Sequence, residues 1–208
     1  MEFTSFLNTI NHIKTAKIGG LESQFRLAPK MRLNYNEEKI AASNPKKAAV
    51  LALFYPNEKG ETCFLLTQRA SYKGTHSAQI SFPGGKIEKA DKNLKETALR
   101  ETFEEVGISE ENINVIREIT DVYIPPSNFL ATPFIAFSEE KPNLIINHEV
   151  DHTFDVLLKD LLDDSNITSI NITTSYAKNT DVPCFKLNNY IVWGATAMIL
   201  NEIKELLK

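Results

Sequence analysis

Residues 84–108 read GGKIEKADKNLKETALRETFEEVGI, and this stretch decides what the rest of the chain is expected to build around it. Its second half, residues 93–106, contains neither glycine nor proline and spaces its apolar residues as a helix does, so it predicts a helix. Gly107 follows directly, in the position where glycine most often ends a helix. Gly84 and Gly85 stand after Pro83, so a turn is expected to precede the helix.

The predicted helix separates apolar and acidic side chains. Leu99, Phe103 and Val106 form the expected buried face. The opposite face carries three glutamates: Glu101, Glu104 and Glu105. Like charges one turn apart repel, and a helix C-terminus disfavours anions, so the cluster is costly by itself. A bound divalent cation would remove the conflict, and carboxylate oxygens favour Mg²⁺ or Mn²⁺. The alternative is a glutamate-rich helix end that simply faces water.

The remaining elements predict an α/β protein with a mixed β-sheet between helices. Strands are expected at residues 49–55, 62–67, 79–82, 115–124, 129–137, 150–156, 167–176 and 184–193, and helices at 4–15 and 196–207, with a helical turn at 157–162. Helices and strands mix without a regular alternation, which is why the sheet is expected to be mixed. Residues 21–46 predict an irregular segment. The chain is therefore divided into an N-terminal helix and lead-in, 1–46, and a main domain, 47–208.

Composition and charge exclude several classes of function. The 208 residues include 23 Lys and Arg against 27 Asp and Glu, a formal net charge of −4, which argues against a general nucleic-acid binder. No apolar run approaches the ~18 residues that cross a membrane. The two cysteines, Cys63 and Cys184, predict buried thiols in a reducing compartment. The cytoplasm is the expected location. Phe185 and Trp193 are expected to fill the core rather than stack on an adenine.

The stretch from Gly85 to Ile108 resembles the Nudix box. That pattern runs Gly, five residues, Glu, seven residues, Arg-Glu, an apolar residue, any residue, Glu-Glu, any residue, Gly and an apolar residue. Residues 100–108 fit it except that Thr102 holds an apolar position. In the first half Asp91 replaces the glutamate, and the gap from there to Arg100 is one residue longer. The resemblance covers about residues 45–200 and implies the Nudix α/β/α sandwich.

The departing first half is similar to one Nudix branch, the coenzyme A diphosphatases. Two further stretches carry the likeness: residues 65–70, LLTQRA, and residues 82–85, FPGG. The branch expects an arginine at position 74 and a glycine at position 78, where this chain has Gly74 and Ala78. Lys73 could supply the missing cation from the neighbouring position.

The resemblance implies a role for each matching residue. Glu101 and Glu105 would be the main metal ligands, with contributions from Glu104 and the Gly85 carbonyl, and Arg100 would orient the glutamates. The metal would be Mg²⁺ or Mn²⁺. Asp91 would be structural. The implied substrate contacts are Arg69, Lys73 and Phe82. The base that activates water would be one of the box glutamates or Glu149.

The implied reaction is hydrolysis of the diphosphate bond of coenzyme A or its derivatives, giving 3′,5′-ADP and 4′-phosphopantetheine. Another Nudix hydrolase, acting on ADP-ribose or a dinucleotide, is the alternative. A module that has lost catalysis is a third possibility, against which the intact Glu101, Glu104 and Glu105 argue. The expected partner is a small nucleotide-type substrate, without nucleic acid or membrane, and a homodimer is possible.

Overall fold

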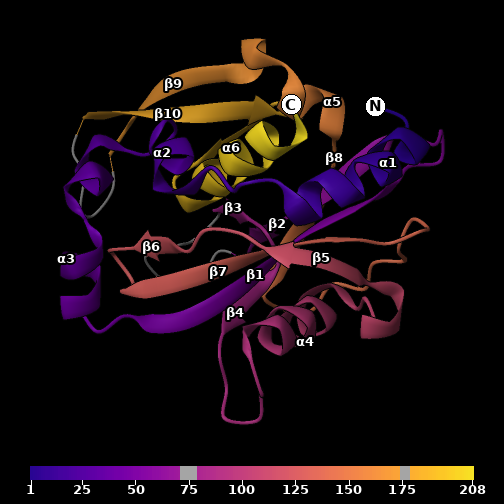
Figure 1. Cartoon of the computed structure of the whole chain (residues 1–208), viewed down its shortest axis with the longest axis horizontal. Helices are drawn as coiled ribbons and strands as arrows, with labels where there is room; N and C mark the ends of the chain where they lie inside the picture. The colour runs from indigo at the N-terminus through magenta and orange to yellow at the C-terminus, as the bar shows by residue number, and fades with distance from the viewer. Residues whose placement is uncertain (71–78, 174–178) are drawn as a thin grey trace.

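The protein is a layered α/β structure, seen here in a computed structural model that describes residues 1–70, 79–173 and 179–208. A central sheet has one helix, α4, on one face and helices α1 and α6 on the other (Figure 1). A second, smaller sheet covers the outer side of α6. The predicted fold class, a mixed sheet between helices, is confirmed.

Strand β1 (Lys46–Pro56) is the centre of the large sheet. It pairs antiparallel with β2 (Thr62–Arg69) and β4 (Gly84–Lys86), and parallel with β7 (Phe129–Phe137). Among the described residues this sheet has eight strands. The other four are β3 (Ile80–Ser81), β5 (Asn114–Glu118), β6 (Val122–Ile124) and β8 (Val150–Leu157).

Both faces of β1 are buried because its side chains alternate between two hydrophobic clusters. Leu51 and Leu53 pack with α4 (Leu94–Val106) on one face. Ala52 and Phe54 pack on the other face with α1 (Phe3–Thr15) and α6 (Ala195–Leu207). This explains why the strand is a nearly continuous apolar run in the sequence.

The buried face of α4 differs from the sequence prediction. Leu99 and Val106 are buried as expected, but the side chain of Phe103 is exposed. Thr102 is fully buried in its place, and its hydroxyl donates to the Ala98 carbonyl oxygen at 2.7 Å. The helix therefore turns the side of Ala98 and Thr102 toward the sheet, which leaves Phe103 at the rim.

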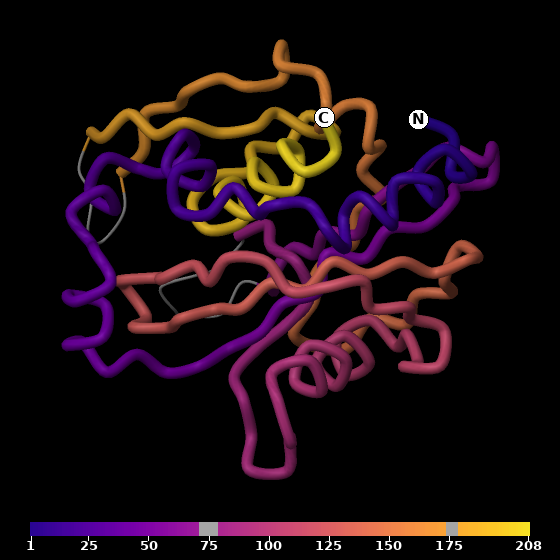
Figure 2. Tube along the Cα trace, viewed as in Figure 1, coloured from indigo at the N-terminus to yellow at the C-terminus, as the bar shows by residue number. Residues whose placement is uncertain are grey.

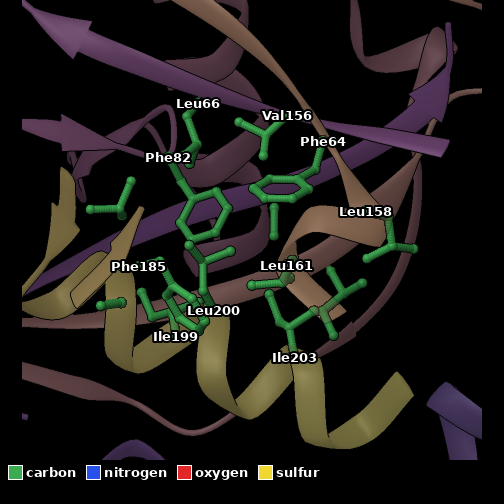
Figure 3. Packing of buried hydrophobic residues seen from close by; sticks show 14 of the residues in the cluster. Phe64, Leu66, Phe82, Val156, Leu158, Leu161, Phe185, Ile199, Leu200 and Ile203 are labelled. Atoms are coloured by element: carbon green, nitrogen blue, oxygen red, sulfur yellow. The ribbon is translucent and has the colours of Figure 1, made fainter. Parts of the chain in front are cut away.

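The cluster beneath α6 is the larger part of the core. Figure 3 shows side chains from α6 and from the sheet pointing toward one another, with the ring of Phe82 between Leu66 and the α6 residues. Helix α5 (Leu158–Leu162) follows β8 and contributes Leu158 and Leu161 to the same cluster. The outer sheet consists of β9 (Ile167–Ile172), β10 (Thr180–Leu187) and β11 (Tyr190–Trp193). The predicted single strand over 184–193 is wrong, because Asn188 and Asn189 adopt positive φ and form a turn inside it.

The N-terminal segment is more regular than predicted. It forms α2 (Gly20–Phe25), a 3₁₀ helix η1 (Lys30–Asn34) and α3 (Glu37–Ala42). Figure 2 shows its trace running alongside α6 toward the turn between β6 and β7. The fully buried Glu202 of α6 fixes it, accepting hydrogen bonds from the Gly20 amide at 3.0 Å and the Gln24 side chain at 2.9 Å. The described residues also form two short 3₁₀ helices, η2 (Glu110–Asn112) and η3 (Asp164–Asn166).

Candidate active site

Both ends of α4 are set by its sequence. The side chain of Asn93 caps the first turn by accepting the amide hydrogen of Glu96 at 3.0 Å. At the other end Gly107 has a φ of 76°, which glycine adopts without strain, and its amide donates to the Phe103 carbonyl oxygen at 2.8 Å. The helix therefore begins and ends at defined residues, and this fixes the positions on α4 from which its three glutamates project.

Strand β4 receives two of these glutamates at Gly84 and Gly85, which are paired with β1 and do not form the turn that the sequence predicts. The Gly84 amide donates to the carboxylate of Glu105 at 3.2 Å. A Cβ on Gly85 would lie 2.5 Å from the carboxyl carbon of Glu101, so any larger residue would displace that carboxylate. Gly84 has a φ of 150°, and a Cβ there would lie 2.3 Å from the carbonyl oxygen of Ala49. The paired glycines are thus required for different reasons, the first by the β1 backbone and the second by a glutamate.

Arg100 connects the acidic groups to one another. Its Nε donates to Asp91 at 2.9 Å, its Nη1 to Glu104 at 3.0 Å, and its Nη2 lies 3.0 Å from Glu101. Nη2 also donates to the Lys86 carbonyl oxygen at 3.1 Å. The planar guanidinium serves all four acceptors at once, which the single ammonium of a lysine could not do.

Asp91 is the anchor of Arg100. Only 4% of its side chain is exposed, and it accepts hydrogen bonds from the Glu88 amide and the Thr97 hydroxyl, each at 2.9 Å. The hydrogen bonds from Arg100 hold the pKa of the Asp91 carboxyl far below its usual range. Asp91 is therefore ionised, and its carboxylate is occupied by these partners. Thr97 was not singled out in the sequence, although it lies one helical turn before Arg100 on the same side of α4.

Burial raises the pKa of the two glutamates that face the glycines of β4. Desolvation raises the pKa of Glu105 to about 7, with the Gly84 amide acting in the opposite direction. Desolvation also raises the pKa of Glu101, and the charge of Arg100 opposes it. Nearby carboxylates, Glu149 among them, add to both shifts. Two partly buried carboxylates whose charge is disfavoured form a site that gains from a cation.

Arg69 and Glu149 lie together at the neighbouring edge of the sheet. Arg69 ends β2 and Glu149 directly precedes β8, and their side chains form an ion pair at 3.0 Å. The Ala70 amide donates to the Glu149 carbonyl oxygen at 2.8 Å. The Asn147 amide donates to the Glu105 carbonyl oxygen at 3.1 Å, so the segment carrying Glu149 is attached to the end of α4. Asn147 has no signal in the sequence, because its role depends on this contact.

The residues present suit a hard divalent cation. In the described part of the chain no three His, Cys, Asp or Glu side chains already converge as a metal-binding group. Mg²⁺, however, is usually held by one or two carboxylates, with water and substrate phosphates completing its shell. Glu101 and Glu105 provide those two carboxylates beside the Gly85 backbone, while Glu104 is half-exposed and bound to Arg100.

Most of the predicted site residues come together, and one does not. Glu101 and Glu105 meet at Gly84 and Gly85 of β4, with Arg100 and Glu104 beside them. The assignment of Phe82 as a substrate contact is not supported, because its side chain is 3% exposed and packs in the core beneath α6 (Figure 3). Because Phe82 directly precedes Pro83 and β4, its packing fixes the start of β4 to the core. Lys73 lies outside the described residues.

Comparison with known proteins gives one family. A family profile described as NUDIX domain matches residues 45–167. The Arabidopsis thaliana protein called Nudix hydrolase 15, mitochondrial, is 33% identical over 163 residues, which are 75% of this chain and 56% of that protein. Nudix hydrolase 3 of Caenorhabditis elegans is 27% identical over 71% of this chain and 68% of its own. The chain therefore spans little more than half of the Arabidopsis relative.

A solved structure supports the fold. The NUDIX domain of Shewanella oneidensis NrtR, solved in complex with ADP ribose, superposes with a TM-score of 0.54 and 16% identity. The match covers 86% of this chain and 97% of that one. In the described part of the chain no helix is both long and apolar enough to cross a membrane.

Proposed function

Because the chain belongs to the Nudix hydrolase family, whose profile matches more than half of it, we propose that it hydrolyses the diphosphate bond of a nucleoside diphosphate derivative with a divalent cation. Membership of the family predicted from residues 85–108 is confirmed. The observation that supports the proposed reaction is that Glu101 and Glu105 meet at Gly84 and Gly85 of β4, because a cation bound there would stabilise two partly buried carboxylates.

Each residue of the site has a proposed task. Glu101 and Glu105 hold Mg²⁺ or Mn²⁺, with the Gly85 carbonyl and Glu104 contributing. When bound, the ion would supply charge neutralisation at the diphosphate and would make water a better nucleophile. Arg100 holds Glu101 and Glu104 in place through its bonds to Asp91.

The side chains of Arg69 and Glu149 act on the substrate from the sheet edge. Arg69 is half-exposed, and a substrate phosphate would compete with Glu149 for its guanidinium. Release from that ion pair leaves Glu149 free to accept a proton from the attacking water. Glu105 is the other candidate base, because its pKa of about 7 lies near neutral pH.

We propose coenzyme A or a derivative as the substrate, with 3′,5′-ADP and 4′-phosphopantetheine as products. Support comes from the branch-like residues 65–70 and 82–85. Leu65 and Leu66 are buried in β2 while Arg69 pairs with Glu149 at its end, so we propose that the first stretch both builds the sheet and offers Arg69 to a phosphate. A cytoplasmic location and a homodimer stay predictions.

A second candidate is hydrolysis of ADP-ribose or a dinucleotide. It is favoured by Gly74 and Ala78, which depart from the coenzyme A branch, and by the ADP ribose complex of the NrtR domain. A module without catalysis is the third candidate, and the acidic site argues against it.

A substrate panel with identified products separates these candidates. The protein would be incubated, with Mg²⁺ or Mn²⁺, with each of five substrates: coenzyme A, its oxidised form, ADP-ribose, NADH and diadenosine polyphosphates. The products would be identified by mass spectrometry. We expect 3′,5′-ADP from coenzyme A at the highest kcat/KM. The matched control is Glu105→Gln, which should lower kcat by at least ~10²-fold, a loss of about 2.7 kcal/mol. Preference for ADP-ribose would favour the second candidate, and no hydrolysis of any compound would favour the third.

A further inference from the structure

A cavity lies away from the acidic cluster and shares no lining residue with it. It has a volume of about 610 Å³, within the range of small-molecule binding sites. Its walls come from the 3₁₀ helix η1 and the residues around it, from the turn between β6 and β7, and from the outer sheet. Val182 of β10 is buried in its floor, whereas Lys39 and Pro126 are exposed at its rim.

Most of this cavity is built from parts of the chain outside the family match. The NUDIX profile covers residues 45–167. The segment around η1 precedes the match, and the lining residues of the outer sheet, Ile172, Val182 and Trp193, follow it. Pro125 and Pro126 are the lining residues that the match includes. The N-terminal segment and the outer sheet therefore form the cavity together, and the residues matched by the NUDIX profile do not form it alone.

The lining suits a flat ring with a negative charge. Tyr35 and Trp193 present aromatic surface, and Trp193 is only half-buried instead of filling the core as predicted. The charged residues among the described lining are Arg32 and Lys39, both cations, in a chain whose net charge is −4. Lys39 donates from Nζ to the Asn34 carbonyl oxygen at 2.9 Å, a neutral acceptor, and no ion pair of Lys39 occurs among the described residues. Cations beside aromatic and proline surface recognise an anionic aromatic group.

We propose that this cavity binds a phosphorylated nucleoside, with the base against Tyr35 and Trp193 and the phosphate toward Lys39 and Arg32. The nucleotide has two possible sources, the nucleotide end of the substrate or a separate nucleotide that regulates the enzyme. The proposal rests on the cavity and its lining, so it does not depend on hydrolysis at the acidic site.

The chain provides its own reporter for this site, because Trp193 is its single tryptophan. Metal-free protein in EDTA would be titrated with 3′,5′-ADP and with AMP while tryptophan fluorescence is recorded. We expect a saturable change in tryptophan fluorescence with at least one of these nucleotides. The substitution Lys39→Glu should raise the Kd of that nucleotide at least tenfold. Lys17→Glu, an equal charge change at an exposed position outside the cavity, should leave Kd within twofold. Absence of a saturable change, or equal effects of the two variants, would overturn the proposal.

Kinetics with the best panel substrate distinguish the two sources. If the cavity holds the substrate's nucleotide end, Lys39→Glu raises KM at least fivefold with kcat within twofold, and the mononucleotide inhibits competitively. If the nucleotide is a regulator, it changes kcat in the wild type and loses that effect in Lys39→Glu. An inactive protein that still shows the fluorescence change would refute the proposed hydrolysis and leave the cavity assignment intact.

Discussion

Replacing Glu105 by glutamine should stabilise the metal-free protein at alkaline pH, although it removes a residue of the proposed active site. Glu105 is partly buried, and desolvation raises the pKa of its carboxyl from 4.5 to about 7. Glutamine keeps an oxygen that can accept the Gly84 amide hydrogen and carries no charge. The substitution therefore removes the cost of a buried anion while keeping the local hydrogen bond.

The magnitude follows from the difference in proton affinity between the folded and unfolded states. The folded state binds the proton more tightly, so the free energy of unfolding falls as pH rises from about 4.5 to about 7. Each pKa unit corresponds to ~1.4 kcal/mol, so the full cost at pH 8 is about 3 kcal/mol. At pH 5 the cost is below about 1 kcal/mol, because both states are then largely protonated or near their midpoints.

Urea unfolding of wild type and Glu105→Gln at pH 5 and pH 8, both in EDTA, measures this difference. We expect the variant to gain about 2 to 3 kcal/mol at pH 8 and less than about 1 kcal/mol at pH 5. Glu140→Gln is the matched control, because Glu140 is exposed in a loop and its substitution should change stability by less than ~0.5 kcal/mol at either pH. If Glu105→Gln changed the free energy of unfolding equally at both pH values, or lowered it at pH 8, the view that the Glu105 charge is disfavoured in the metal-free protein would be refuted.

Other substitutions test separate contacts of the site. Gly84→Ala should destabilise the fold by about 2 kcal/mol or more, seen as a lower Tm, because its Cβ meets the β1 backbone. Gly85→Ala should leave Tm within a few degrees but lower Mg²⁺-dependent kcat at least tenfold, because its Cβ displaces Glu101; an unaffected kcat would contradict this. Arg100→Lys should cost about 1 to 3 kcal/mol in urea unfolding, because Asp91 loses paired hydrogen bonds. Arg69→Ala should raise KM for coenzyme A about tenfold with kcat little changed, and an unchanged KM would remove Arg69 from the phosphate site.

The strands and long helices could be predicted because their patterns are local. The apolar run of β1 and the uninterrupted segment of α4 each carry their own periodicity, and Gly107 marks the helix end. The N-terminal segment could not be predicted in the same way. Helix α2 is held by contacts with Glu202 and η1 by a hydrogen bond from Arg32 to the Tyr123 carbonyl oxygen, and these partners lie far away in the sequence. The exposure of Phe103 likewise depends on how α4 sits on the sheet.

The residues of the candidate site differ in the same way, because some are positioned by local sequence and others by distant contacts. Residues within the box, such as Glu101 and Arg100, are fixed by spacing on one helix, so the sequence was sufficient to bring them together. The pairing of Arg69 with Glu149 depends on the register of β2 and β8. Phe82 shows the limit of a motif, because this residue of a signature stretch packs in the core, which its place in the motif does not predict.

Titration of Mn²⁺ into the metal-free protein, followed by electron paramagnetic resonance, tests the proposed cation site most directly. We predict saturable binding to the wild type and at least tenfold weaker binding to both Glu101→Gln and Glu105→Gln, with Glu140→Gln unchanged. Wild-type affinity in both glutamine variants would contradict the assignment of these two glutamates as the metal ligands.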